Sequence, residues 1–66
     1  MIIYIARYCE YGEDLKAFIS YQEAVQFIIE DSKDYEETLS EEERQKWRQS
    51  IIENDNEFFS IYTLTL

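Results

Sequence analysis

Residues 2–9 are β-branched or aromatic with almost no polar interruption. Such a run predicts a strand with at least one covered face, and we expect this strand to be central in its sheet. Residues 10–14 contain Gly12, the only glycine of the chain, where a positive φ costs least. We therefore predict a hairpin turn at this point and a second strand over residues 15–19.

Two stretches in the middle of the chain have helical periodicity. Ser20 precedes the first stretch, and Glu23 is placed to complete a capping box with it. The apolar positions that follow share one helical face: Ala24, Phe27 and Ile28. This pattern predicts a helix over residues 21–31.

The second helix is predicted to begin at Ser40, which forms another capping box with Glu43. Trp47 and Ile51 share one of its faces. We expect the helix to end near residue 53, because residues 54–56 are two asparagines and an aspartate that favour a turn.

Residues 58–66 form the third predicted strand, but the apolar positions do not keep a single alternation. Phe59 and Ile61 are in phase with each other, whereas Tyr62 and Leu64 have the opposite phase. Two interpretations stay open: both faces of the strand are partly covered, or a β-bulge shifts the phase midway.

The elements follow one another in the order β-β-α-α-β, which predicts an α+β fold over residues 1–66 as a single small domain. We expect a three-stranded, mainly antiparallel sheet with two helices packed on one face and the first strand paired with the third. The open edges of such a sheet are candidate surfaces for self-association, and a homodimer would stabilise so small a core.

The 66 residues include 15 Asp and Glu, 6 Lys and Arg, no His and one Cys, with a formal net charge of −9. A single cysteine excludes an intramolecular disulfide and the usual Cys and His zinc sites, and it favours a reducing compartment. Direct binding to nucleic acid or to a membrane is disfavoured, because phosphate contacts need Lys and Arg. With no apolar stretch long enough to span a bilayer and no signal peptide, we expect a cytoplasmic location in the host cell.

The most distinctive feature is an acidic segment between the two predicted helices and at their facing ends. It has eight carboxylates and one lysine, Lys33; the acids are Glu30, Asp31, Asp34, Glu36, Glu37, Glu41, Glu42 and Glu43. The helix dipole favours acids at the start of the second helix but disfavours them at the end of the first. Two interpretations stay open: a solvated face, or a surface for a basic partner that imitates the phosphates of a nucleic acid.

Tyrosine is frequent, with six residues in the chain, and it combines apolar area with a polar tip. Tyr35, within the acidic segment, is predicted to be an exposed aromatic anchor for the partner. Tyr4, Tyr8 and Tyr11 form a secondary candidate interface on the first strand and its turn. Tyr11 is expected to be exposed, whereas Tyr4 and Tyr8 either cover the sheet or bind a partner.

Trp47 and Ile51 are predicted to form the core face of the second helix, with Arg44 and Arg48 beside them. At helical spacing these arginines are expected to pair with the nearest acids: Glu37, Glu41 or Glu43. A site where nucleic-acid bases stack on Trp47 is disfavoured, because the surrounding field is negative.

No motif for catalysis or metal binding is present. Without a histidine, Cys9 has no base to activate it, and we expect it to be a small apolar residue near the sheet interior. There is no glycine-rich phosphate loop and no calcium-loop spacing. We therefore predict no catalytic residue, no metal site, no cofactor and no enzymatic activity.

Several short stretches carry a resemblance: Ile2-Ile3-Tyr4-Ile5-Ala6-Arg7-Tyr8, Lys16-Ala17-Phe18, Ser20-Tyr21-Gln22-Glu23-Ala24 and Phe59-Ser60-Ile61-Tyr62-Thr63-Leu64. They resemble the opening hairpin, the first helix start and the last strand of small phage and mobile-element accessory proteins. By size and acidity the chain is also similar to anti-CRISPR and anti-restriction inhibitors, some of which act as nucleic-acid mimics. The resemblance rests on structural residues, so it implies a fold more than a role.

Two functional hypotheses follow. The first is a non-enzymatic acidic inhibitor that uses the acidic segment and Tyr35 to bind the basic, nucleic-acid-binding surface of a host defence or replication protein. The alternative is a protein–protein interaction or assembly module, antitoxin-like or homodimeric, that binds through its sheet face while the acids serve solubility. In the alternative, charge reversal at Glu36 and Glu37 leaves binding intact, and changes at Tyr4 or Tyr8 abolish it.

Overall fold

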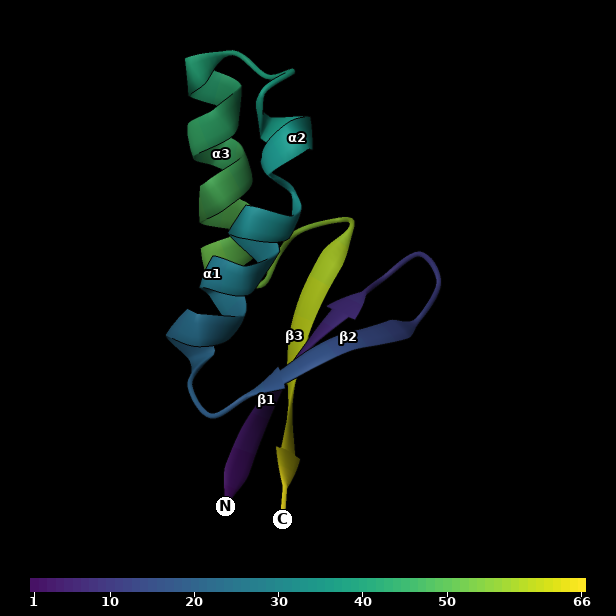
Figure 1. Ribbon diagram of the computed structural model, residues 1–66. Coiled ribbons are helices and arrows are strands. Elements are labelled where there is room, and N and C mark those ends of the chain that lie inside the picture. Colours follow the sequence, from purple (N-terminus) through teal and green to yellow (C-terminus); the bar gives the residue numbers. More distant parts are fainter.

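A computed structural model describes residues 1–66 of the chain (Figure 1). The elements are β1 Ile2–Tyr8, β2 Glu13–Phe18, α1 Tyr21–Asp31, α2 Lys33–Glu36, α3 Glu41–Ile52 and β3 Phe59–Thr65. The strands form one antiparallel sheet in the order β2-β1-β3. This confirms the α+β fold, the central first strand and its pairing with the third, and it adds the short helix α2, which was not predicted.

The register of β1 with β3 is continuous, so β3 contains no bulge. The mixed pattern of β3 instead reflects two different faces. Phe59 and Ile61 belong to the buried core on the helix side, whereas Tyr62 and Leu64 point to the opposite side because side chains alternate along a strand. The one register shift in the sheet lies between β1 and β2, next to Ala6.

The core lies between the sheet and α1. Ala6 and Ala24 are fully buried, and Ile28 and Ile51 are almost fully buried. The other members of the buried cluster are Val25, Phe59 and Ile61. Alanine on both β1 and α1 allows these elements to approach closely, and the branched side chains fill the space around them.

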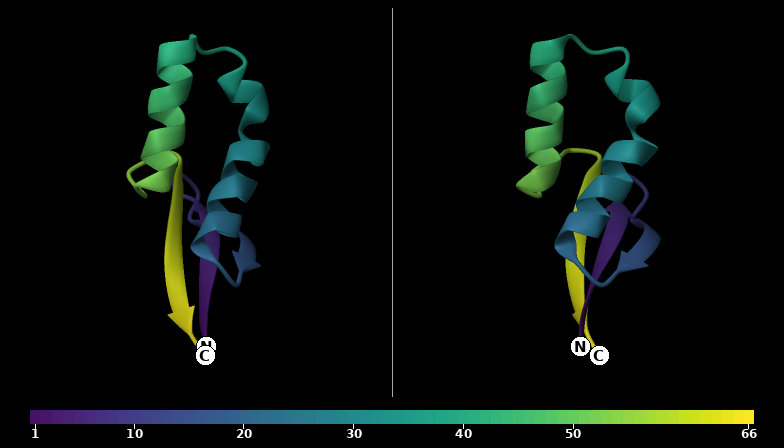
Figure 2. Two further views of the ribbon diagram at one scale, coloured as in Figure 1. Left: turned by 90° about the vertical axis from the view of Figure 1, so that its left-hand side faces the viewer. Right: turned by 60° about the vertical axis from the view of Figure 1, so that its left-hand side comes forward.

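The two long helices have different relations to the sheet. α1 contacts all three strands, whereas α3 packs against α1 and reaches the core with Ile51, near its C-terminal end. α2 and the first turns of α3 extend past the end of the sheet, and the molecule is therefore elongated, with extents of 40 × 22 × 17 Å (Figure 2). No helix here is both long enough and apolar enough to cross a membrane.

Tyr4 and Tyr8 lie on the helix side of β1, where both are half-buried and pack against the core. The Tyr4 ring meets the Tyr21 ring edge-on with a centroid distance of 6.0 Å, and Tyr8 meets Phe59 in the same way at 5.3 Å. Tyr4 and Tyr8 thus cover the core, which is one of the two roles that the sequence left open, and both stay partly accessible. Tyr11 is exposed, as predicted, and stacks on Tyr8 at 5.3 Å.

The opposite face of the sheet carries no helix. Leu64 on this face is 45% exposed. A polar cluster lies beside it: Arg7 pairs with Asp14 at 3.2 Å, and the Tyr62 hydroxyl donates to the same carboxylate at 2.7 Å. The hydrogen bond with Asp14 raises the pKa of Tyr62.

Two asparagines close the connection between α3 and β3. Asn54 has a φ of 57°, in the left-handed region that asparagine tolerates better than most residues. Its side-chain amide donates to the carbonyl of Ile61 and accepts from the N–H of Ile61, both at 2.8 Å. Asn56 Oδ1 accepts from the N–H groups of Phe58 and Phe59. The predicted turn is thereby fastened to the start of β3.

The two predicted helix caps differ in completeness. Ser20 accepts from the N–H of Glu23 at 3.2 Å without a bond in return, whereas Ser40 and Glu43 form a full capping box. The hydrogen bond from the Ser40 backbone lowers the pKa of Glu43. Cys9 is exposed, so its predicted place in the sheet interior is wrong. It follows Tyr8, the last residue of β1, and lies outside the strand.

Candidate binding surface

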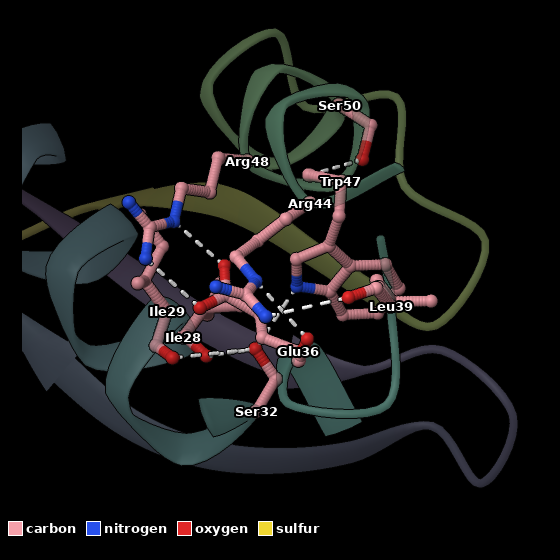
Figure 3. Close-up of polar contacts among 9 residues, drawn as sticks. All are labelled: Ile28, Ile29, Ser32, Glu36, Leu39, Arg44, Trp47, Arg48 and Ser50. Atoms are coloured by element: carbon pink, nitrogen blue, oxygen red, sulfur yellow. Dashed lines mark hydrogen bonds and ion pairs between the residues drawn. The ribbon is translucent and has the colours of Figure 1, made fainter. Parts of the chain in front are cut away.

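The join between α2 and α3 is made by one buried carboxylate. Glu36 is 3% exposed and accepts two hydrogen bonds from Arg48, from Nε at 2.7 Å and from Nη2 at 3.0 Å (Figure 3). These hydrogen bonds hold the pKa of Glu36 below its usual range, against the opposing effect of burial. Glu36 is therefore a structural residue, and its predicted place among the partner-binding acids is corrected.

Arg44 strengthens the same join through backbone groups. Its Nε donates to the carbonyl of Glu36 at 3.1 Å, and its Nη2 donates to the carbonyl of Leu39 at 3.3 Å (Figure 3). Neither Arg44 nor Arg48 pairs with the acids expected from helical spacing, which were Glu37, Glu41 and Glu43, so that prediction is wrong. The chain turns back after α2, and this brings Glu36 next to Arg48, which pairs with it across the two helices.

Trp47 connects α3 to the end of α1. Its indole Nε1–H donates to the buried hydroxyl of Ser32 at 3.1 Å, and that hydroxyl donates to the carbonyl of Ile28 at 2.9 Å (Figure 3). Ser32 separates α1 from α2 and is 6% exposed. The indole is thereby held in one orientation, with its ring partly buried against the core.

Three aromatic rings gather beside this contact, and we name them the aromatic ridge: Tyr35, Trp47 and Phe58. The ring centroids are 4.7 Å apart for Tyr35 and Trp47, 5.9 Å for Trp47 and Phe58, and 6.3 Å for Tyr35 and Phe58. Tyr35 is 46% exposed and Phe58 is 38% exposed. Tyr35 was predicted to be exposed, whereas Phe58 was predicted only as the first residue of a strand.

A hollow lies on each side of the aromatic ridge. The first hollow has a volume of about 360 Å³ and is lined by the ridge with Tyr8, Asp31, Ser32, Asp34 and Phe59. The second hollow has a volume of about 230 Å³ and is lined by the ridge with Ser50, Asp55, Asn56 and Glu57. Each hollow thus contains two carboxylates, and no Lys or Arg lines either of them.

We call the aromatic ridge with its two hollows the ridge side. The four carboxylates of the ridge side are not neutralised within the chain. Asp31, Asp34, Asp55 and Glu57 form no ion pair, since the three pairs of the structure are Arg7–Asp14, Lys46–Glu42 and Arg48–Glu36. A cation brought to either hollow therefore meets negative charge without a competing group of the protein.

The remaining predicted acids have different surroundings. Glu30 and Glu37 border a depression that also contains Lys33, Arg44 and Arg48, and Glu41 lies beside the same two arginines. We call the surface formed by these acids and the two arginines the arginine side. Glu42 pairs with Lys46 at 3.7 Å, and the Glu43 carboxylate accepts from the Ser40 N–H. The acidic segment is therefore divided: its negative charge is partly compensated on the arginine side and uncompensated on the ridge side.

The chain was compared with protein-family models, curated proteins and solved structures, and none of them matches. No group of three or more Cys, Asp or Glu side chains is arranged to hold a metal ion. The functional assignment therefore depends on the geometry of the surface itself.

Proposed function

We propose that this chain is a non-enzymatic binding protein that docks on the basic, nucleic-acid-binding surface of another protein and inhibits it. The observation that carries the proposal is the ridge side, where exposed aromatic rings are flanked by four carboxylates with no internal partner. Uncompensated charge favours long-range attraction to an oppositely charged surface, and aromatic side chains supply contact area once it has docked. In this proposal the partner loses access to nucleic acid because the inhibitor covers the groups that contact phosphate.

The proposal is tested by capture with competition. The full chain is immobilised and exposed at low salt to the heparin-binding proteins of a cell extract, and retained proteins are eluted with duplex DNA or with rising salt. We expect both treatments to release the same proteins. Duplex DNA competes for the phosphate-binding surface of the partner, and salt screens the charges that hold the two proteins together.

Two charge-matched variants locate the surface. The ridge-side variant combines Asp31→Asn, Asp34→Asn, Asp55→Asn and Glu57→Gln, and the arginine-side variant combines Glu30→Gln, Glu37→Gln, Glu41→Gln and Glu42→Gln. Both change the net charge equally, and we expect only the ridge-side variant to lose capture. Equal retention by both variants, or elution that is indifferent to salt and DNA, would show that the proposal is wrong.

A second candidate function is supported by the helix-free face of the sheet. Leu64 is half-exposed there and Tyr62 lies beside it, so this face offers apolar area to a second copy or to another protein. In this case Leu64→Gln abolishes association while the ridge-side variant keeps it. Sedimentation velocity over a range of chain concentrations separates a homodimer from a monomer.

A further inference from the structure

We propose that the first hollow receives an arginine side chain of the partner, with the guanidinium stacked on the aromatic ridge and hydrogen-bonded to Asp31 and Asp34. This inference rests on the proposed function and specifies its central contact. The occupant is a guanidinium on a protein surface, and its recognition depends on ring faces and carboxylates that the chain already holds in place.

The first step is the attraction between a cation and the exposed rings. The faces of Trp and Tyr carry negative electrostatic potential, and a guanidinium within about 6 Å of a ring centroid is attracted to it. The hollow is bordered by Tyr8, Tyr35 and Trp47, which offer such rings from β1, α2 and α3. The chain already shows the same contact elsewhere, where the Arg7 guanidinium lies 5.0 Å from the Tyr62 ring centroid.

The second step is the placement of the acids. Asp31 is the last residue of α1 and Asp34 is the second residue of α2, and both residues border the same hollow. Every ion pair of the chain is formed by other acids, and neither Asp31 nor Asp34 accepts a side-chain hydrogen bond. Two open carboxylates next to an aromatic surface complement a group that is planar, cationic and rich in N–H donors.

Arginine fits this arrangement better than lysine. Its guanidinium is flat, stacks on an aromatic face and still donates N–H groups at its edge to carboxylates, and it loses water more readily than an ammonium group. The hollow is open to solvent, so a strongly hydrated lysine would keep its water and gain less from the rings.

The hollow is already formed before anything binds. Trp47 is held by Ser32, and α2, which carries Tyr35, is held against α3 by the pair of Glu36 and Arg48. A preformed site loses little conformational entropy on binding, which favours recognition even of a single side chain.

The test titrates the full chain with three short peptides that differ at one position. The peptides are acetyl-Gly-Arg-Gly-amide, the lysine analogue and the citrulline analogue, which has the shape of arginine without its charge. Binding is followed by the NMR shift of the Trp47 indole N–H and of the backbone amides of residues 31–35. We expect saturable shifts for the arginine peptide with a Kd on the order of 1 mM, weaker shifts for lysine and none for citrulline.

Variants of exposed residues assign the contacts. Asp31→Asn and Asp34→Asn are each expected to weaken the arginine peptide by about two- to fivefold, as for exposed charge pairs. Tyr35→Leu keeps apolar area but removes a ring, and it is expected to weaken binding by a similar factor. Glu23→Gln, at the opposite end of α1, is the matched control and is expected to leave the Kd unchanged.

Three outcomes would overturn the inference. Equal binding of arginine and citrulline peptides would show that charge is not recognised, and equal binding of arginine and lysine peptides would remove the preference for a guanidinium. Shifts of Trp47 that depend on chain concentration without peptide would show that a second copy occupies the ridge. If the peptides fail while capture stays sensitive to DNA, salt and the ridge-side variant, the arginine assignment falls and the proposed function stands.

Discussion

The two ends of the molecule are held together by different kinds of contact. Between the sheet and α1, the buried side chains Ala6, Ala24 and Ile28 are apolar. Between α2 and α3, hydrogen bonds run from Arg48 to the Glu36 carboxylate and from Arg44 to backbone carbonyls, beside one aromatic contact of Tyr35 with Trp47. Apolar burial depends little on pH or salt, whereas charged hydrogen bonds depend on both. The sheet end therefore secures the fold, and the helical end shapes the binding surface.

The largest effect is expected at the sheet end, from Ile28→Ala. Ile28 is 1% exposed, and the lost burial with the cavity left behind is expected to lower the free energy of unfolding by about 2–5 kcal/mol. Urea unfolding followed by circular dichroism measures this. Ile28→Val, with an expected loss of about 0.5–1.5 kcal/mol, keeps the test usable if the alanine variant does not fold. Ile52→Ala, at a half-exposed position, is the control, and an equal loss there would contradict the comparison.

At the helical end, Glu36→Gln is expected to lower the free energy of unfolding by about 1–3 kcal/mol, because two hydrogen bonds from Arg48 lose their charged acceptor. The lower part of this range is expected, since the Arg48 side chain is 51% exposed and can be hydrated. Glu37→Gln, at the exposed neighbouring position, is the matched control. Indistinguishable urea midpoints for the two variants would show that the buried pair does not hold α2 against α3.

The cap of α3 is expected to contribute less. Ser40→Ala removes the acceptor for the Glu43 N–H and is expected to cost about 1 kcal/mol. The loss should be local, so amide hydrogen exchange in the first turn of α3 is expected to accelerate more than exchange in β1. Ser20→Ala is the comparison, because Ser20 caps α1 without the reciprocal bond. A larger cost for Ser20→Ala would reverse the expected order.

The smallest effect is the pH dependence of the helical end. The Glu36 pKa is lowered in the folded chain, so the unfolded chain binds the proton more readily. The stability from this group is complete above the unfolded pKa of about 4.3, and it is lost as the pH falls through the lower folded pKa. The difference between the parent chain and Glu36→Gln in urea unfolding should therefore shrink in this acidic range. A difference that stays constant down to the lowest pH would contradict the assignment.

The fold was predictable because its signals are local. The apolar runs of the strands, the helix faces and the two serine caps each depend on residues close together in the sequence, and the structure confirms them. For β3 the sequence left two interpretations open, and only the continuous register with β1 excludes the bulge.

The site was predictable only in part, because its contacts depend on the path of the chain. Nothing local indicates that α1 breaks at Ser32 and that α2 turns Glu36 toward Arg48. Pairing at helical spacing was therefore the wrong rule for the arginines. Tyr35 and Trp47 could each be singled out by type, but their meeting with Phe58 requires the fold. The excess of acid was visible in the composition, whereas the separation of compensated from uncompensated acids was not.

The asparagines after α3 have a consequence for how copies of this chain meet. An unpaired strand border is a template on which a second chain can add, and β3 is such a border. The amide of Asn54 occupies both backbone groups of Ile61, and Asn56 occupies the N–H of Phe59. On the β3 edge, only the last part of the strand, around Thr63 and Thr65, can still pair with a strand of another chain. These two side chains thus protect the beginning of the β3 edge from strand addition, although β3 itself contains neither Pro nor Lys.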